Sequence, residues 1–89
     1  METEEIRKKI RDAKTYLEDY RSYGSMVTEA IDALNRIDEL VIDPSDEHLV
    51  EALTIAEELN KRLEPYRIYV PTLAEYMDQL LEWLKSQKR

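Results

Sequence analysis

The residues that break helices are few in this chain and fall at only three places. The chain contains one glycine and three prolines, which are Gly24, Pro44, Pro65 and Pro71. Glycine ends helices readily because it reaches backbone conformations closed to other residues, and proline cannot continue a helix that has already formed. These residues divide the chain into four segments without an internal breaker. We expect helices at about residues 3–22, 26–41, 44–64 and 72–87.

Apolar residues recur in each segment at alternating steps of three and four, which places them on one face of a helix. In the first segment they are Ile6, Ile10, Ala13, Leu17 and Tyr20. Helices of similar length joined by short connections favour antiparallel packing of neighbours. The sequence therefore predicts an all-α fold, an antiparallel up-down-up-down four-helix bundle, with residues 1–89 as a single helical-bundle domain. A three-helix core with a loosely docked fourth helix is the alternative arrangement.

The predicted helix ends have recognisable capping residues. Gly24 is expected in the left-handed conformation that follows a helix C-terminus. Asp43 is expected to cap the third helix, with Pro44 at the first helical position, where its missing N–H costs nothing. Thr72 and Glu75 have the spacing of a capping box, in which the two side chains satisfy free backbone N–H groups.

The charge and composition exclude several classes of protein. The chain has 13 basic and 20 acidic residues and a net charge of −7, which disfavours nucleic-acid binding because a duplex binder needs surplus lysine and arginine. Cysteine is absent, so disulfides and thiolate chemistry are excluded. The apolar runs are far shorter than the ~20 residues of a membrane span, and no apolar segment near Met1 indicates a signal peptide. We expect a soluble, cytoplasmic protein that binds neither nucleic acid nor membrane.

Acidic residues are concentrated in the middle of the chain. Residues 25–64 contain eleven acids and three bases. These helices present either an ordinary solvated surface or an acidic docking surface for a basic partner. Opposite charges also recur four positions apart, an arrangement that supports exposed helix faces. The pairs are Glu4/Lys8, Glu5/Lys9, Lys14/Glu18, Asp32/Arg36, Glu57/Lys61 and Glu58/Arg62.

Signals for catalysis and metal binding are weak. His48 is the only histidine, and with Glu51 it offers two ligands one helical turn apart, fewer than a di-iron bundle requires. Ser45 and Asp46 are its neighbours in sequence, but nothing indicates an oxyanion hole or a substrate pocket. We expect no enzyme activity, no cofactor and no metal, and we expect His48 to be a surface or half-buried residue. A metal or phosphotransfer role for His48 is the alternative.

Tyrosine is the unusual feature of the composition, with six tyrosines beside one tryptophan and no phenylalanine. An antiparallel bundle brings all six tyrosines to one end, under a connection at residues 66–70 that we expect to be extended and packed over that end. The tyrosines then either plug the end of the bundle or form a binding patch. Trp83 falls toward the opposite end, as a packing anchor or a contact residue. The candidate partner-binding residues are Tyr23, Tyr66, Tyr69 and Trp83.

Helix caps, charge pairs and apolar faces all favour the same four helices along the whole chain. In this respect the sequence resembles computationally designed (de novo) helical bundles, in which propensity, patterning and capping are consistent. The resemblance implies a stable monomer that has no specific biochemical activity and requires no partner. The eight-residue connection at 64–71 and the scattered β-branched residues suit a design built on natural helical fragments better than one with ideal loops.

The segment Ile68-Tyr69-Val70-Pro71 carries a second resemblance. It is similar to the Tyr-Tyr-Pro element of nuclease-colicin immunity proteins, which are small helical bundles that bind a toxin. Val70 stands in place of the second tyrosine, and Arg67 stands where an acidic residue is expected, so no toxin-binding site is carried over. The resemblance implies a natural, small acidic interaction module, immunity-protein-like or an adaptor, that binds another protein through its acidic helices or its tyrosine-rich end.

Overall fold

The computed structural model describes residues 3–87, and four α-helices account for most of them. The helices are α1 (Thr3–Glu18), α2 (Ser25–Ile42), α3 (Asp46–Leu63) and α4 (Pro71–Gln87). Two short 3₁₀ helices, Arg21–Tyr23 and Glu64–Tyr66, lie in the first and third connections. The described range contains no strand. The outermost residues of the predicted domain, 1–2 and 88–89, lie outside the described residues.

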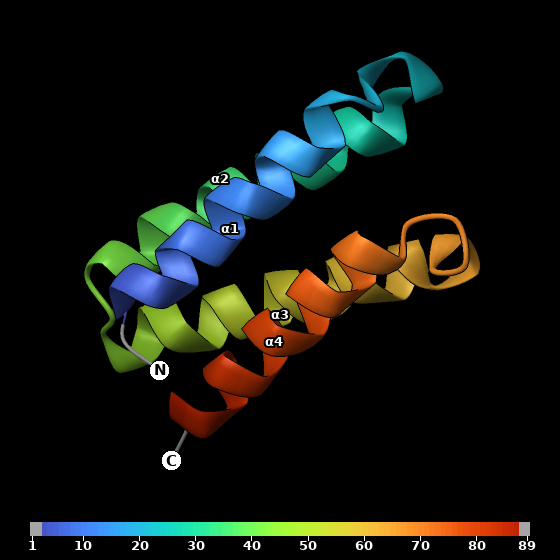
Figure 1. The fold of residues 1–89 in the computed structure, drawn as a ribbon. Helices are drawn as coiled ribbons and strands as arrows, with labels where there is room; N and C mark the ends of the chain where they lie inside the picture. The colour runs from blue at the N-terminus through green and yellow to red at the C-terminus, as the bar shows by residue number, and fades with distance from the viewer. Residues whose placement is uncertain (1–2, 88–89) are drawn as a thin grey trace.

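Each helix packs against two others. α1 contacts α2 and α4, and α3 contacts the same two helices. Successive helices run in opposite directions (Figure 1), so the predicted all-α, up-down-up-down four-helix bundle is confirmed. Figure 1 also shows two hairpins, α1–α2 and α3–α4, that lie close together near the α2–α3 connection and diverge toward the other end. The molecule is elongated, with extents of 36 × 20 × 19 Å.

The core is one apolar cluster drawn from all four helices. Its largest fully buried side chains are Ile6, Ile10, Leu34, Ile37, Val41, Leu73, Met77, Leu80 and Leu84. No polar or charged residue is buried in the described part of the chain. Burying such an apolar side chain stabilises the fold by about 1.5–3 kcal/mol relative to leaving it exposed. Apolar packing therefore holds the four helices together.

The first helix ends earlier than predicted. α1 stops at Glu18 rather than at residue 22, and the chain continues through the 3₁₀ helix Arg21–Tyr23. Gly24 has a φ of 124° and a ψ of −179°, a positive-φ conformation that is essentially restricted to glycine. The positive φ was expected, but the left-handed helical conformation was not the one adopted. Gly24 instead occupies the N-cap position of α2.

The starts of α3 and α4 also differ from the prediction. Ser45 rather than Asp43 is the N-cap of α3, and its hydroxyl accepts a hydrogen bond from the backbone N–H of His48 at 3.2 Å. α4 begins at Pro71, so Thr72 lies in the first turn and is not the N-cap of the predicted capping box. Proline is favoured at the first helical position because an N–H there would have no partner within the helix.

The ion pairs within residues 3–87 are not the predicted pairs spaced by four residues. Arginines join neighbouring elements instead: Arg7 with Asp38, Arg36 with Glu51, Arg62 with Glu29, and Arg67 with Asp78. Two further pairs, Arg21–Glu18 and Arg36–Glu39, are three residues apart. The planar guanidinium can donate twice to one carboxylate, as Arg7 does to Asp38 at 2.9 and 3.4 Å. This hydrogen bonding raises the pKa of Arg7.

Candidate binding site at the tyrosine end

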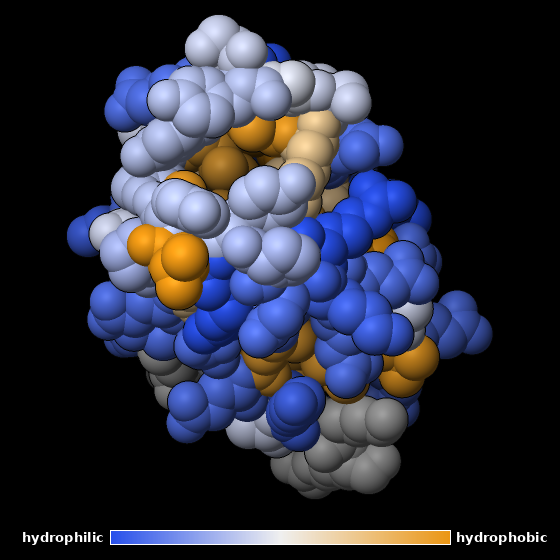
Figure 2. All heavy atoms as spheres, turned by 90° about the vertical axis from the view of Figure 1, so that its right-hand side faces the viewer, coloured by the Kyte–Doolittle hydropathy of each residue, from blue (hydrophilic) through white to orange (hydrophobic). Residues whose placement is uncertain are grey.

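An apolar pocket opens at the end of the bundle where the two hairpins diverge. Its volume is about 540 Å³. Figure 2 looks onto this end and shows a hydrophobic floor inside a rim of weakly polar side chains. The lining comes from all four helices and two connections: Leu17, Tyr20, Tyr23, Met26, Val27, Ala30, Leu63, Tyr66, Tyr69, Val70 and Leu73. We call the pocket together with its four lining tyrosines the tyrosine end.

One wall of the tyrosine end is a row of rings at the end of α1. The ring centroids of Tyr16 and Tyr20 lie 5.3 Å apart, and those of Tyr20 and Tyr23 lie 5.4 Å apart, within the range of favourable aromatic pairs. The backbone N–H of Tyr23 donates to the carbonyl of Tyr20 at 2.9 Å, which keeps the chain coiled beyond α1. The row therefore extends past the end of the helix to the edge of the molecule.

Two hydroxyls in this row are linked by a hydrogen bond. Those of Tyr16 and Tyr20 lie 3.4 Å apart and share a hydrogen bond. This hydrogen bond, together with partial burial, raises the pKa of Tyr16. Tyr16 therefore stays a neutral phenol throughout the physiological pH range.

The facing wall is the third connection, which is coiled and not extended. The backbone N–H groups of Tyr69 and Val70 both donate to the carbonyl of Tyr66, at 2.9 and 3.1 Å. The prediction of an extended segment packed over the bundle end was therefore wrong. In this coiled connection Ile68 is 82% exposed and Tyr69 is 71% exposed.

Arg67 anchors this coiled connection to the bundle. Its guanidinium donates to the two carboxylate oxygens of Asp78 on α4 at 3.3 and 2.8 Å, and to the side-chain oxygen of Asn60 on α3 at 3.2 Å. The hydrogen bonds with Asp78 raise the pKa of Arg67. The connection is thus held from two helices, which gives the facing wall a defined position.

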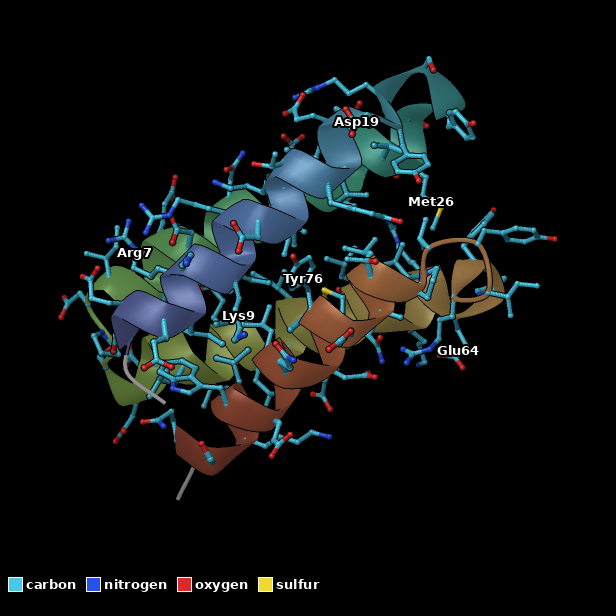
Figure 3. All side chains as sticks on the ribbon, in the orientation of Figure 1. Arg7, Lys9, Asp19, Met26, Glu64 and Tyr76 are labelled. Atoms are coloured by element: carbon cyan, nitrogen blue, oxygen red, sulfur yellow. The ribbon has the colours of Figure 1, made fainter. Side chains whose placement is uncertain are left out.

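The floor of the pocket consists of aliphatic and methionine side chains. In Figure 3, Met26 extends from the first turn of α2 into the space between the two hairpins. Leu17, Ala30 and Leu73 lie deeper and are buried. The small side chain of Ala30 leaves room at this level, and the flexible thioether of Met26 can adapt to what enters the space.

Three of the four candidate contact residues meet at this pocket. Tyr23, Tyr66 and Tyr69 all line it, and they are 78%, 47% and 71% exposed. Trp83 does not belong to this surface, because it is 5% exposed and lies in the core. Trp83 is therefore a packing anchor, which is one of the two roles expected for it. Tyr76 also lies away from the pocket, beside Lys9 of α1.

The pocket itself was not predicted from the sequence. The tyrosines do not plug the end, which stays open between the hairpins. Met26, Val27 and Ala30 line the opening, yet their helical spacing is that of ordinary core residues. No signal in the sequence distinguishes an apolar residue that lines a pocket from one that fills the core.

His48 lies half-buried at the turn between α2 and α3, as expected. Its ring Nδ1–H donates to the carbonyl of Asp43 at 2.6 Å, which ties the ring to the turn. Among residues 3–87, no three histidine, aspartate or glutamate side chains are grouped so that they could hold a metal ion. Within the same range, no helix combines the length and the apolar character needed to cross a membrane.

Comparison of the chain with protein-family models, with curated protein sequences and with solved structures finds no match. The resemblances to designed bundles and to immunity proteins therefore stay predictions. The geometry of the tyrosine end is what bears on function.

Proposed function

We propose that this chain is a small binding module without catalytic activity, and that its binding site is the tyrosine end. The observation that supports this proposal is the convergence of Tyr23, Tyr66 and Tyr69 at the mouth of one apolar pocket. A large part of each ring is exposed, so only part of its surface contributes to packing. Exposed aromatic rings beside an apolar hollow are typical of recognition surfaces.

The chemistry of the lining supports binding rather than catalysis. The eleven lining residues carry aliphatic, thioether and phenol groups only. General acid–base catalysis needs a carboxylate, an imidazole or a comparable group held in the pocket with a suitable pKa. Such a lining can hold a molecule and orient it through hydroxyl groups, but it supplies no strong base and no activated nucleophile.

The acidic helices α2 and α3 are the less favourable candidate for the binding site. Four carboxylates of α2 and α3, those of Glu29, Asp38, Glu39 and Glu51, already form ion pairs with arginines of the same chain. A basic partner would compete with these internal pairs for the same charges. Surface charges also contribute little affinity unless they are removed from water.

The competing proposal is a designed fold with no specific activity. A sequence composed only for folding is expected to fill the end of its bundle, because empty apolar space lowers stability and leaves the packing underspecified. The open volume of about 540 Å³ at the tyrosine end is the reason we favour a binding function.

The experiment compares three immobilised proteins after exposure to cell extract and to its lipid and small-molecule fraction. They are the wild type, the double variant Tyr66→Ala/Tyr69→Ala, and the control Ile42→Ala/Val50→Ala, which removes exposed apolar residues far from the pocket. Mass spectrometry identifies what each protein retains, and circular dichroism checks that helicity is unchanged. We expect a stoichiometric component that the wild type and the control retain and the tyrosine variant loses. Equal retention by all three proteins would contradict the proposal.

A further inference from the structure

The charges around the tyrosine end are directed away from the pocket or are already paired. Asp19 and Glu64 flank this end, and both point away from the space between the hairpins (Figure 3). Arg62 pairs with Glu29, whose Oε2 lies 3.4 Å from its Nη1. Arg67 is held by Asp78 as described above. A charged ligand would lose its water in the pocket and meet no opposite charge there, which is costly.

Arg21 is the remaining basic residue near the α1 wall, and it is also engaged. Two nitrogens of its guanidinium group, Nε and Nη2, donate to the carboxylate of Glu18. This hydrogen bonding raises the pKa of Arg21 and lowers that of Glu18. An anionic headgroup at the mouth would have to displace Glu18 from Arg21, so the charge pattern favours an uncharged occupant.

The size of the pocket favours a small molecule. Its volume of about 540 Å³ falls within the range of roughly 300–1,000 Å³ that is typical of small-molecule sites. A single side chain inserted by a partner protein would leave much of this space empty. Unfilled apolar space forfeits the dispersion contacts that favour binding.

The area of the end argues against a protein occupant. The molecule measures 20 × 19 Å across its long axis, so this end has a cross-section of only about 400 Å², small beside the ~800 Å² per partner that a standard interface buries. The same limit applies to a second copy of this chain placed end to end. A small molecule needs no such area, because the walls of the pocket surround it.

The hydroxyls at the mouth define the polar part of the ligand. Tyr20, Tyr23, Tyr66 and Tyr69 line the pocket, and a neutral phenol can donate or accept a hydrogen bond. The O–H of Tyr20 already donates to Tyr16. The rings of the lining tyrosines also offer faces and edges to a flat ring system. A carbonyl or hydroxyl oxygen on the ligand would find its partners at this level.

We infer that the pocket at the tyrosine end binds an uncharged, largely apolar small molecule that contains a ring system and a single polar group. The apolar part of this ligand lies on the floor of the pocket, and its polar group lies among the tyrosine hydroxyls. This inference rests on the proposed function and names the class of ligand. Leu17, Ala30 and Leu73 would contact the apolar part of the ligand, and the four lining tyrosines would contact its rings.

The test uses two dyes that differ by one charged group. N-phenylnaphthylamine is uncharged, and anilinonaphthalene sulfonate has the same rings with one sulfonate added. We expect the uncharged dye to bind with a fluorescence increase and to shift the NMR signals of Tyr20, Tyr23, Tyr66 and Tyr69. The sulfonate should bind at least about tenfold more weakly, because its charge has no partner in the pocket. Equal affinity for the two dyes would overturn the inference.

A matched pair of variants places the dye in the pocket. Val27→Phe adds a ring at a lining position, whereas Val50→Phe makes the same change at an exposed position of α3 outside the pocket. We expect Val27→Phe to weaken binding of the uncharged dye by about tenfold or more and Val50→Phe to leave it unchanged. Equal weakening in the two variants, with helicity retained, would show that the dye binds elsewhere and would contradict the inference.

The outcomes separate this inference from the proposed function. If the uncharged dye leaves the tyrosine signals unmoved while Tyr66→Ala/Tyr69→Ala still abolishes retention of a protein from cell extract, the ligand class is wrong and the binding site stands. If a second copy of this chain occupied the pocket instead, the NMR signals of the tyrosines would shift with protein concentration and not with added dye. If neither dye nor any extract component depends on the tyrosines, both proposals fail.

Discussion

The two ends of the bundle are built from the same four helices and yet differ in packing. At the end near the α2–α3 turn, Ile6, Val41 and Leu84 are completely buried, and Trp83 is 5% exposed. At the tyrosine end the hairpins diverge, and the space between them is an open pocket. Both ends are rich in apolar side chains, but four tyrosines line the open end, whereas aliphatic residues and Trp83 fill the closed end.

The difference in packing between the two ends follows from the polar atoms that the side chains carry. Aliphatic side chains can meet on the axis of the bundle because they carry nothing that requires water. A tyrosine hydroxyl loses hydrogen bonds if it is buried without a partner, so the ring tends to lie at the boundary with its hydroxyl in water. Tyr20, Tyr23, Tyr66 and Tyr69 therefore form a rim, and the axis between them stays empty.

The largest expected effect compares a leucine from each end. Leu84→Ala removes a fully buried side chain at the closed end and should destabilise the protein by about 3–5 kcal/mol. Leu63→Ala widens a pocket that is already open and should cost about 2 kcal/mol or less, because little new enclosed cavity forms. Urea denaturation monitored by circular dichroism measures both. A cost for Leu63→Ala that equals or exceeds that of Leu84→Ala would mean that the tyrosine end is closed in solution.

The turns at the two ends provide the next comparison. Gly24→Ala places a side chain in open space, with nothing within 4 Å, but at a φ of 124°, so we expect a loss of about 1–3 kcal/mol from backbone strain alone. Ser45→Ala at the opposite turn removes the N-cap hydrogen bond to His48 and should cost about 1 kcal/mol. Thermal denaturation of both variants tests the order. A neutral Gly24→Ala would indicate that the α1–α2 turn relaxes into another conformation.

The smallest expected effect concerns the ion pair that ends α1 at the tyrosine end. The hydrogen bonds from Arg21 lower the pKa of Glu18. Because the folded-state pKa lies below the unfolded one, the stabilising contribution of Glu18 is present above its unfolded pKa and disappears as the pH falls through its folded pKa. NMR titration should show the pKa of Glu18 rising toward its ordinary value in Arg21→Gln. An unchanged pKa would show that the pair is open in solution and does not hold the end of α1.

Much of the fold follows from local signals in the sequence. The three connections occur where glycine and proline predict them, and the apolar faces of the four segments became the core. The errors lie within a few residues of helix ends, at Gly24, Ser45 and Pro71, where several residues compete to cap a helix. The ion pairs were mispredicted because arginine side chains reach carboxylates on neighbouring elements, and those neighbours are set by packing.

The candidate site was predicted only in part. Tyr23, Tyr66 and Tyr69 could be placed at one end from the up-down topology alone, and they share one pocket. The sequence could not show that the third connection coils, since its alternating apolar residues also suit an extended chain. The sequence placed Trp83 toward the opposite end but could not show whether it is buried, because a tryptophan on a helix has the same spacing whether it is buried or exposed.

The sequence by itself determined the number of helices, their antiparallel order and the identity of the core, because these depend on periodicity and on a few residues that break helices. Tertiary structure alone decided that the hairpins diverge at one end, that Arg67 fixes the connection between Asn60 and Asp78, and that an apolar space stays open. Those features depend on the angle between hairpins and on where tyrosine hydroxyls meet water. Both are properties of the assembled bundle rather than of any segment.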